Sequence, residues 1–217
     1  MNTFTLVVGM CALVLVAGHH NKPHECFIRG DPHYLQFDGY DALDFQGRCT
    51  YIVSETSNFN MNNPPTDSFR VLVSNSLLPN HDDLTFSTAV WVIVHGHTVR
   101  LDMERDVILL DDEIANIPHT ESNFNVTHHH PGYVRLLTSF GLEVELQKLT
   151  NANRKHKVWV RVPASYNGQL RGICGNMDGN DDDDDFLTPE GTVENDVTVF
   201  GNSWKQSLGL VEPIECR

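Results

Sequence analysis

A series of short β-type runs separated by turn residues constrains the fold of this chain most strongly. Residues 158–162 are valine or tryptophan at every position but one, and Pro163 ends the run because proline cannot donate to a strand ladder. Glycine-containing turns such as Asp38-Gly39 separate neighbouring runs. The predicted strands cover residues 34–37, 42–45, 49–53, 69–73, 89–94, 98–103, 106–110, 133–138, 142–146 and 158–162. Together with the lack of a long 3.6-residue apolar period, they predict an all-β, antiparallel β-sandwich, with at most a short helix near residues 197–200.

The first 18 residues are predicted to be a secretory signal peptide. Residues 4–17 form an apolar run of about 14, which is too short to span a bilayer, and the run ends in the small-residue pattern Val16-Ala17-Gly18. No later apolar run is long enough for a transmembrane segment. The sequence therefore predicts a secreted, extracellular protein in which residues 19–217 form a single domain that stands alone.

The number of cysteines predicts disulfides, and the net charge narrows the possible partners. Removal of the signal peptide would take away Cys11 and leave four cysteines, so two disulfides are expected, with three possible pairings. These four are Cys26, Cys49, Cys174 and Cys216. The formal net charge of −14 argues against nucleic acid and anionic membranes as partners, because both attract basic proteins. The negative charge suits cation binding or solubility.

The stretch 172–186 is rich in the oxygen-bearing side chains that Ca²⁺ prefers. The residues at alternate positions are Asn176, Asp178, Asn180 and Asp182. A looping backbone could turn several of these oxygens toward one hard cation. The pattern is not an EF-hand, since counting from Asp178 places Asp183 where glycine is needed and Pro189 where glutamate is needed. The alternative interpretation is a solvated acidic turn.

Short motifs occur in a definite order at the two ends of the chain. The N-terminal set is Cys26, Gly30-Asp31-Pro32-His33-Tyr34, Phe37-Asp38-Gly39 and Phe45-x-Gly47-x-Cys49-x-Tyr51. The C-terminal set is Tyr166-x-Gly168, Gly172-Ile173-Cys174-Gly175-Asn176, Asp184-Asp185-Phe186 and Phe200-Gly201-Asn202-Ser203-Trp204. In this joint order the chain closely resembles a von Willebrand factor type D domain, over about residues 24–217. Mucins, clotting and matrix proteins, and egg-yolk lipoproteins contain this module.

The resemblance implies a β-sandwich with a Ca²⁺ site where the N-terminal turn meets the C-terminal acidic loop. The implied ligands are side-chain oxygens of Asp38, Asn176, Asp178, Asp184 and Asp185, with a backbone carbonyl near Asn180. The acidic loop is one residue longer than the usual pattern, which leaves open the choice among Asp181 to Asp185. The resemblance also implies two disulfides, Cys26 with Cys174 and Cys49 with Cys216.

Two features near these motifs bear on chemistry. Multimerising relatives carry a Cys-Gly-Leu-Cys pair, whereas here Arg171 occupies the first position, so disulfide-linked polymerisation is not expected. In some relatives the Gly-Asp-Pro-His sequence cleaves itself at the Asp–Pro bond. If Asp31, Pro32 and His33 did so here, a disulfide at Cys26 would retain the small fragment. The alternative is a simple turn that precedes a strand.

The sequence contains other candidate sites. Asn125 begins the sequon Asn-Val-Thr and is a glycosylation candidate in a predicted surface loop, beside a His128–His130 run that could bind Zn²⁺ or Cu²⁺ adventitiously. His95 and His97 are expected to flank a hairpin turn. The hydrolase motifs G-x-S-x-G and H-E-x-x-H and the nucleotide-binding motif G-x-x-x-x-G-K-[ST] are absent. A metal-dependent hydrolase that uses Asp178 and Asp184 is a minor hypothesis, and no catalysis is expected.

The sequence predicts a secreted Ca²⁺-binding structural or interaction module of extracellular matrix, mucus or mineralised matrix. Its expected partners are matrix or other secreted proteins. The alternative is a lipid- or lipoprotein-associated binding module, which a hydrophobic cavity would support.

Overall fold

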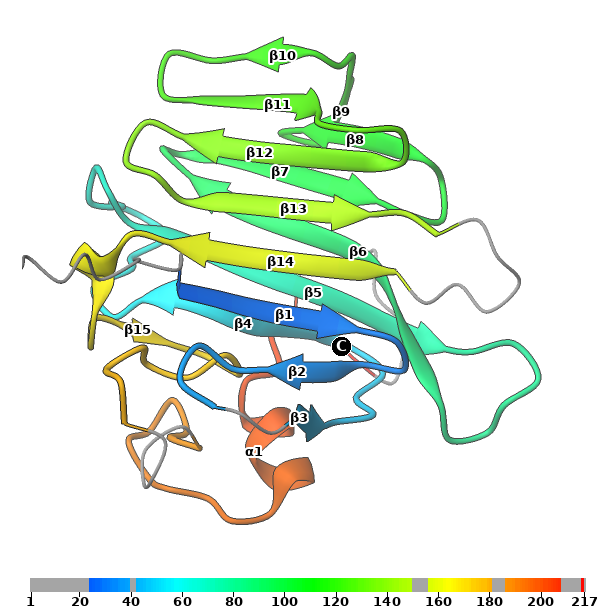
Figure 1. Cartoon of the computed structure of the whole chain (residues 1–217), viewed down its shortest axis with the longest axis vertical. Helices are drawn as coiled ribbons and strands as arrows, with labels where there is room; N and C mark the ends of the chain where they lie inside the picture. The colour runs from blue at the N-terminus through cyan, green and yellow to red at the C-terminus, as the bar shows by residue number, and fades with distance from the viewer. Residues whose placement is uncertain (1–23, 40–41, 150–155, 181–185, 208–215, 217) are drawn as a thin grey trace, which may run out of the picture.

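The computed structural model describes residues 24–39, 42–149, 156–180, 186–207 and 216. Within these residues the chain is a sandwich of two antiparallel β-sheets, one of eight strands and one of seven (Figure 1). The predicted fold class is therefore confirmed. No helix among the described residues is long and apolar enough to cross a membrane. The predicted signal peptide, residues 1–18, lies outside the described residues.

The eight-stranded sheet has the order β10-β11-β12-β13-β14-β1-β2-β3. Its strands are β10 (His119–Thr120), β11 (Phe124–His128), β12 (Tyr133–Thr138), β13 (Glu143–Gln147), β14 (Lys157–Val162), β1 (His24–Arg29), β2 (His33–Leu35) and β3 (Ala42–Asp44). The pairing of β1 with β14 brings Cys26 opposite Val160, so the N-terminal segment lies inside a sheet made mainly of later strands.

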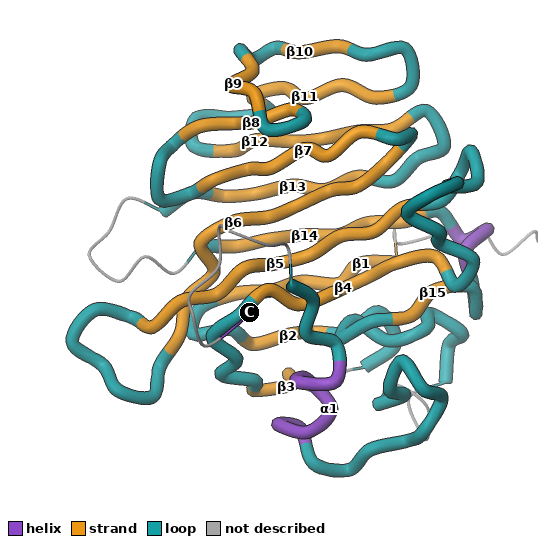
Figure 2. The backbone as a smooth tube through the Cα atoms, turned by 180° about the vertical axis from the view of Figure 1, so that it is seen from behind, coloured by secondary structure: helices purple, strands orange, loops and turns teal. Residues whose placement is uncertain are grey.

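The seven-stranded sheet has the order β15-β4-β5-β6-β7-β8-β9. Its strands are β15 (Leu170–Arg171), β4 (Thr50–Thr56), β5 (Phe69–Leu77), β6 (Thr85–Val94), β7 (His97–Asp102), β8 (Val107–Leu110) and β9 (Glu113–Ala115). The predicted hairpin turn lies between β6 and β7, where His95 and Gly96 both have positive φ. In both views β8 to β11 lie at one end of the sandwich and β2, β3 and α1 at the other (Figures 1 and 2).

The core forms between the two sheets because inward positions alternate along the strands. In β14, Val158, Val160 and Val162 are buried, whereas Trp159 stacks on Phe27 with ring centroids 4.8 Å apart. This two-residue period is the one that a half-buried strand imposes. The central strand β6, paired on both sides with β5 and β7, is buried at all ten positions.

Two strands contradict the expectations from sequence. The first strand expected from the sequence covered residues 34–37, but β1 begins at His24 and buries Cys26 and Ile28 on one face. The sequon at Asn125 was predicted to lie in a loop, but it belongs to β11, between buried Phe124 and Val126. Asn125 alternates with these core residues, so its side chain faces outward and glycosylation stays a prediction.

The C-terminal part of the described chain covers one end of the sandwich. A 3₁₀ turn, η1 (Ala164–Tyr166), precedes β15, and the short helix α1 (Val197–Ser203) follows the acidic loop. The sequence left room for a short helix near residues 197–200, and α1 lies there. Asp196 precedes it and accepts hydrogen bonds from the N–H groups of Thr198 and Val199. Buried Phe200 of α1 packs against Phe186, with ring centroids 5.2 Å apart.

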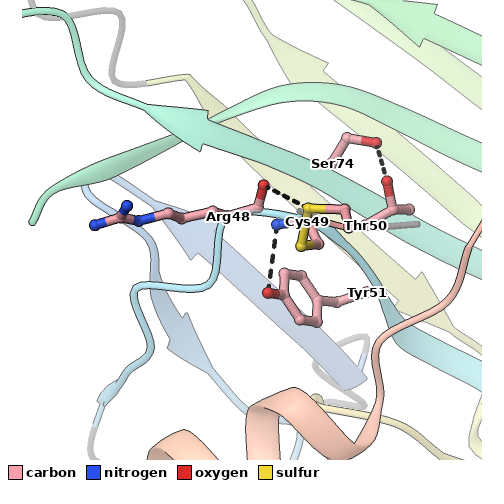
Figure 3. The surroundings of a disulfide bond; sticks show 6 residues. Arg48, Cys49, Thr50, Tyr51 and Ser74 are labelled. Carbon is pink, nitrogen blue, oxygen red and sulfur yellow. Dashed lines mark hydrogen bonds between the residues drawn. A yellow bond between two sulfur atoms is a disulfide. The ribbon is translucent and has the colours of Figure 1, made fainter. Parts of the chain in front are cut away.

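Both disulfides pair as the family resemblance implies. Cys26 is bonded to Cys174 and Cys49 to Cys216, with Cα–Cα distances of 5.8 and 5.4 Å. Around Cys49, the backbone N–H donates to the Tyr51 hydroxyl at 3.3 Å (Figure 3). Each bond joins residues more than 140 positions apart, so both close long loops of the unfolded chain and stabilise the fold mainly in that way.

Candidate functional site

The turn after β2 is held against the C-terminal loop by hydrogen bonds next to the first disulfide. The Phe37 N–H donates to the Cys174 carbonyl at 3.1 Å, and the Gln36 side chain donates to the Ile173 carbonyl at 2.8 Å. The same loop is fixed on its other side to β4, where the Cys174 N–H donates to the Val53 carbonyl at 2.8 Å. Gly172 allows this close contact with β4, because its φ is +129° and an added Cβ would lie 2.6 Å from the Val53 carbonyl oxygen. Asp38 therefore directly follows two residues, Gln36 and Phe37, that are fixed in place by hydrogen bonds.

The loop that faces Asp38 is a series of tight turns made by its own side chains. The Asn176 Oδ1 accepts from the Asp178 N–H at 3.0 Å, and the Asp178 Oδ1 accepts from the Asn180 N–H at 2.8 Å. Positive φ values at Met177 and Gly179 fold the backbone between these residues. These short side-chain to backbone bonds are typical of Asx turns, and they gather several oxygens in a small volume.

Asp38 connects the two segments and is left incompletely satisfied. Its Oδ1 accepts from the Gly179 N–H at 3.1 Å, whereas its Oδ2 is buried without a hydrogen-bond partner. Burial raises the pKa of the Asp38 carboxyl, the charge of Asp178 raises it further, and the hydrogen bond from Gly179 opposes the rise. A buried, unpartnered carboxylate oxygen is costly unless a cation or a proton accompanies it.

The residues present fit a hard cation in donor type and in charge. The structure brings Asp38 next to the turn of Asn176, Asp178 and Asn180, all of which offer the oxygen atoms that Ca²⁺ prefers. Asp184 and Asp185 lie outside the described residues. Within the part of the chain that the structure describes, no three His, Cys, Asp or Glu side chains gather closely enough to hold a metal. A complete Ca²⁺ site would thus need oxygens from the 181–185 stretch.

The Gly-Asp-Pro-His turn between β1 and β2 contains a second cluster of polar groups. The His33 Nδ1 is hydrogen-bonded to the carboxylate of Asp44, and its Nε2 lies 3.6 Å from the Asp31 carboxylate. The backbone carbonyl of Asp31, which precedes Pro32, accepts from the Gln46 side chain at 3.3 Å. The turn therefore holds an imidazole and an amide donor next to the Asp–Pro bond.

Sequence reasoning missed Asp44 and Gln46. Asp44 reaches His33 because β2 and β3 are paired with these two residues opposite each other. Gln46 is fixed from its other end, where its Oε1 accepts from the Thr85 N–H at 2.8 Å and from the Thr85 hydroxyl at 3.2 Å. In the sequence, Asp44 was only a polar position within the predicted strand 42–45, and Gln46 was only the polar residue that follows that strand.

Arg171, which replaces a cysteine of the multimerising pattern, forms an ion pair instead. Its Nε lies 2.8 Å from an oxygen of Glu55, a residue that is 1% exposed. This contact is an ion pair and not a hydrogen bond, so the attraction is electrostatic. Glu55 is also bound on its other side by Arg70 at 2.5 Å, and the three residues are neighbours across β15, β4 and β5.

The histidine run does not form a three-residue metal site within the described residues. His129 is bonded to Glu145 at 2.8 Å and stacks on His130, while His128 ends strand β11. These contacts attach the run to the sheet.

The fold and the site together define a disulfide-bonded β-sandwich in which an N-terminal turn is clamped to a C-terminal acidic loop. The profile of the von Willebrand factor type D domain matches residues 26–192. This chain belongs to the von Willebrand factor type D domain family.

Its relatives include much larger proteins. It is 34% identical over 199 residues to the IgGFc-binding protein of Homo sapiens, 32% identical over 187 residues to zonadhesin of Sus scrofa, and 32% identical over 180 residues to mucin-5B of Gallus gallus. The alignments cover 88%, 85% and 83% of this chain, but only 3%, 7% and 8% of those relatives. The chain thus spans less than a tenth of the length of these relatives.

Proposed function

We propose that this chain is a secreted, Ca²⁺-stabilised structural module of an extracellular matrix or mucus, without catalytic activity. Membership of a family shared with a mucin supports the extracellular setting, and the two disulfides suit an oxidising compartment. The observation that carries the Ca²⁺ part is the buried, unpartnered Oδ2 of Asp38 beside the acidic turn.

Asp38, Asn176 and Asp178 would hold the ion, together with oxygens from residues 181–185. A bound Ca²⁺ would supply positive charge to carboxylates that otherwise repel each other. Contacts within the chain would position the ligands. The Gly179 N–H and the Cys26–Cys174 disulfide hold the two ligand-bearing segments together, so that ion binding and folding are coupled.

Thermal unfolding of the disulfide-intact protein tests this proposal. With an extracellular-type dissociation constant of about 10⁻⁴ M and about 10 mM Ca²⁺, stabilisation should be about 2.7 kcal/mol relative to chelator. At roughly 2–4 °C per kcal/mol for a chain of this size, the midpoint should rise by about 5–11 °C. Mg²⁺ at the same concentration should have a smaller effect, because it demands a tighter octahedral shell.

Variants separate a specific site from general screening of the negative charge. Asp38→Asn should remove most of the Ca²⁺-dependent rise, whereas Asp83→Asn, which removes one exposed charge from a distant loop, should keep it. A midpoint that is indifferent to chelator in the wild-type protein would refute the proposal. An equal rise in wild type and Asp38→Asn would show that Ca²⁺ acts only by screening.

A second candidate function, self-cleavage at the Asp31–Pro32 bond, is favoured by the hydrogen bond from Gln46 to the Asp31 carbonyl. Attack of the Asp31 carboxylate on its own carbonyl carbon would form a cyclic anhydride, and the Pro32 nitrogen would leave with a proton. One water molecule then opens the anhydride, so the net reaction is hydrolysis. The Gln46 amide would stabilise negative charge that develops on the carbonyl oxygen, as oxyanion-hole donors do.

Mass analysis before and after reduction tests self-cleavage. The expected result is one mass without reductant and two fragments with it, the larger beginning at Pro32, because Cys26–Cys174 retains the smaller piece. Asp31→Asn should abolish cleavage and Gln46→Ala should slow it about 10²-fold or more. An intact chain after reduction of the wild-type protein would eliminate this function, with no bearing on Ca²⁺ binding.

A further inference from the structure

A cavity of about 290 Å³ opens between the two sheets at the end of the sandwich farthest from the acidic loop. Its lining residues come from β7, β8 and β9 on one side and from β11, β12 and β13 on the other, with the loops beside them. Figure 1 shows these strands together at one end of the sandwich. This volume is at the lower end of the range of small-molecule sites in proteins. At roughly 30 Å³ per water-sized group, it would accommodate about ten non-hydrogen atoms.

Two cross-strand rows of side chains form the cavity. In the seven-stranded sheet Leu101, Ile108 and Ala115 are successive register partners. In the eight-stranded sheet Leu146, Val134 and His128 are successive partners.

The inner members of both rows are buried leucines that close the core, with Leu101 1% and Leu146 4% exposed. The outer members are the small Ala115 and the exposed His128. The space therefore remains at the outer end, with an apolar floor and a polar rim.

The rim contains one cation that an anionic group could meet, Lys148. The Lys148 ammonium lies at the mouth, 2.6 Å from the Asp106 carboxylate, whose side chain is 77% exposed. Lysine has three donor hydrogens, so Lys148 can also bind an anion that enters the cavity. The other acidic residue of the lining, Asp102, forms an ion pair with Arg100 at 2.8 Å. It also accepts hydrogen bonds from the backbone N–H groups of Glu104 and Arg105. Its charge is compensated within the fold.

An apolar wall also extends outward from the rim. Ile114 of β9 lines the mouth and is 73% exposed, more than any other large hydrophobic residue among those the structure describes. Leaving an isoleucine in water forgoes the stabilisation that its burial would give. The part of an apolar tail that lies at the mouth of the cavity would cover it.

We propose that this cavity binds a medium-chain amphipathic carboxylate, with its tail between the two rows and its carboxylate on Lys148. A chain of about ten carbons fits the volume. Because the protein carries a net charge of −14, long-range electrostatics oppose the ligand, so affinity depends on burial of the tail and on the short-range contact with Lys148. The site is remote from Asp38 and does not depend on Ca²⁺ binding.

Isothermal titration calorimetry with decanoate below its micellar concentration tests the proposal, with decanol as the uncharged probe. The wild-type protein should bind one decanoate per chain. Lys148→Met, which keeps the apolar stem, should weaken decanoate about tenfold and leave decanol unchanged. Lys205→Met, an exposed position at the other end of the sandwich, is the matched control and should bind like wild type.

Ala115→Phe locates the site, because it fills the outer end of the cavity from a short edge strand. It should abolish binding of both probes while the far-ultraviolet circular dichroism stays unchanged. Failure of wild type to bind either probe would overturn the proposal. Equal loss of decanoate and decanol in Lys148→Met would overturn the assignment of the carboxylate, and unchanged binding in a folded Ala115→Phe would overturn the location.

Discussion

Removal of the Glu55 charge should destabilise the protein strongly, because this carboxylate lies between two guanidinium groups. Glu55 is 1% exposed, and Arg70 and Arg171 contact it from the two neighbouring strands. Glu55→Gln leaves both cations facing a neutral amide. Loss of one partner of a buried ion pair typically costs about 3–5 kcal/mol.

The two arginines should contribute unequally. The Arg70 side chain is 14% exposed and also lies over the Phe59 ring at 4.5 Å, so solvent screens it little. The Arg171 side chain is 37% exposed, and Arg171→Met should therefore cost about 1 kcal/mol or less. Taking the lower limit of about 3 kcal/mol for Glu55→Gln, the unfolding midpoint should fall by about 6–12 °C.

Urea and thermal unfolding of four proteins would measure these effects: wild type, Glu55→Gln, Arg171→Met and the double variant. The coupling energy from this cycle should be at least about 0.5 kcal/mol, as for residues in direct contact. Glu55→Gln within about 0.5 kcal/mol of wild type would refute the reasoning. Zero coupling would show that Arg171 does not stabilise β15 through Glu55.

Two further predictions concern packing and pH. Gly201→Ala should destabilise by about 1–3 kcal/mol in urea unfolding, because a Cβ there would lie 2.5 Å from the Phe45 ring, whereas Asn202→Ala on the exposed side should be near neutral. Burial and the charge of Asp67 raise the pKa of Tyr166 from 10.0 to about 12, so the folded state favours the neutral phenol and stability should fall as pH rises from 10 toward 12. Tyr166→Phe should flatten that part of the stability–pH curve, and an unchanged slope would contradict the assignment.

Sequence patterns predicted most central strands because their periodicity is local. They failed at β1, where His24, Glu25 and Arg29 masked the alternation of Cys26 and Ile28 that the sheet buries. Pairing with β14, more than a hundred residues later in the chain, makes this segment a strand. No local signal contains that information.

The residues of the candidate site were likewise predicted only in part. The family motifs identified Asp38 and the acidic turn, and the structure brings these two segments together. The amide of Gln46 and the carboxylate of Asp44 were not predicted, because their roles depend on how β3 and the loop before β6 pack around residues 30–33. Such contacts arise only when the sheets assemble.

The outermost strands of both sheets are very short. β10 and β3 have two and three residues, and β15 and β9 have two and three. A long exposed edge strand would offer a row of free backbone donors and acceptors with which a neighbouring molecule could pair. Short edge strands offer few such groups. The short edges would thereby protect the protein from stacking into fibrils through its sheets. Any assembly of this protein should instead use contacts between side chains, which leave each copy separable.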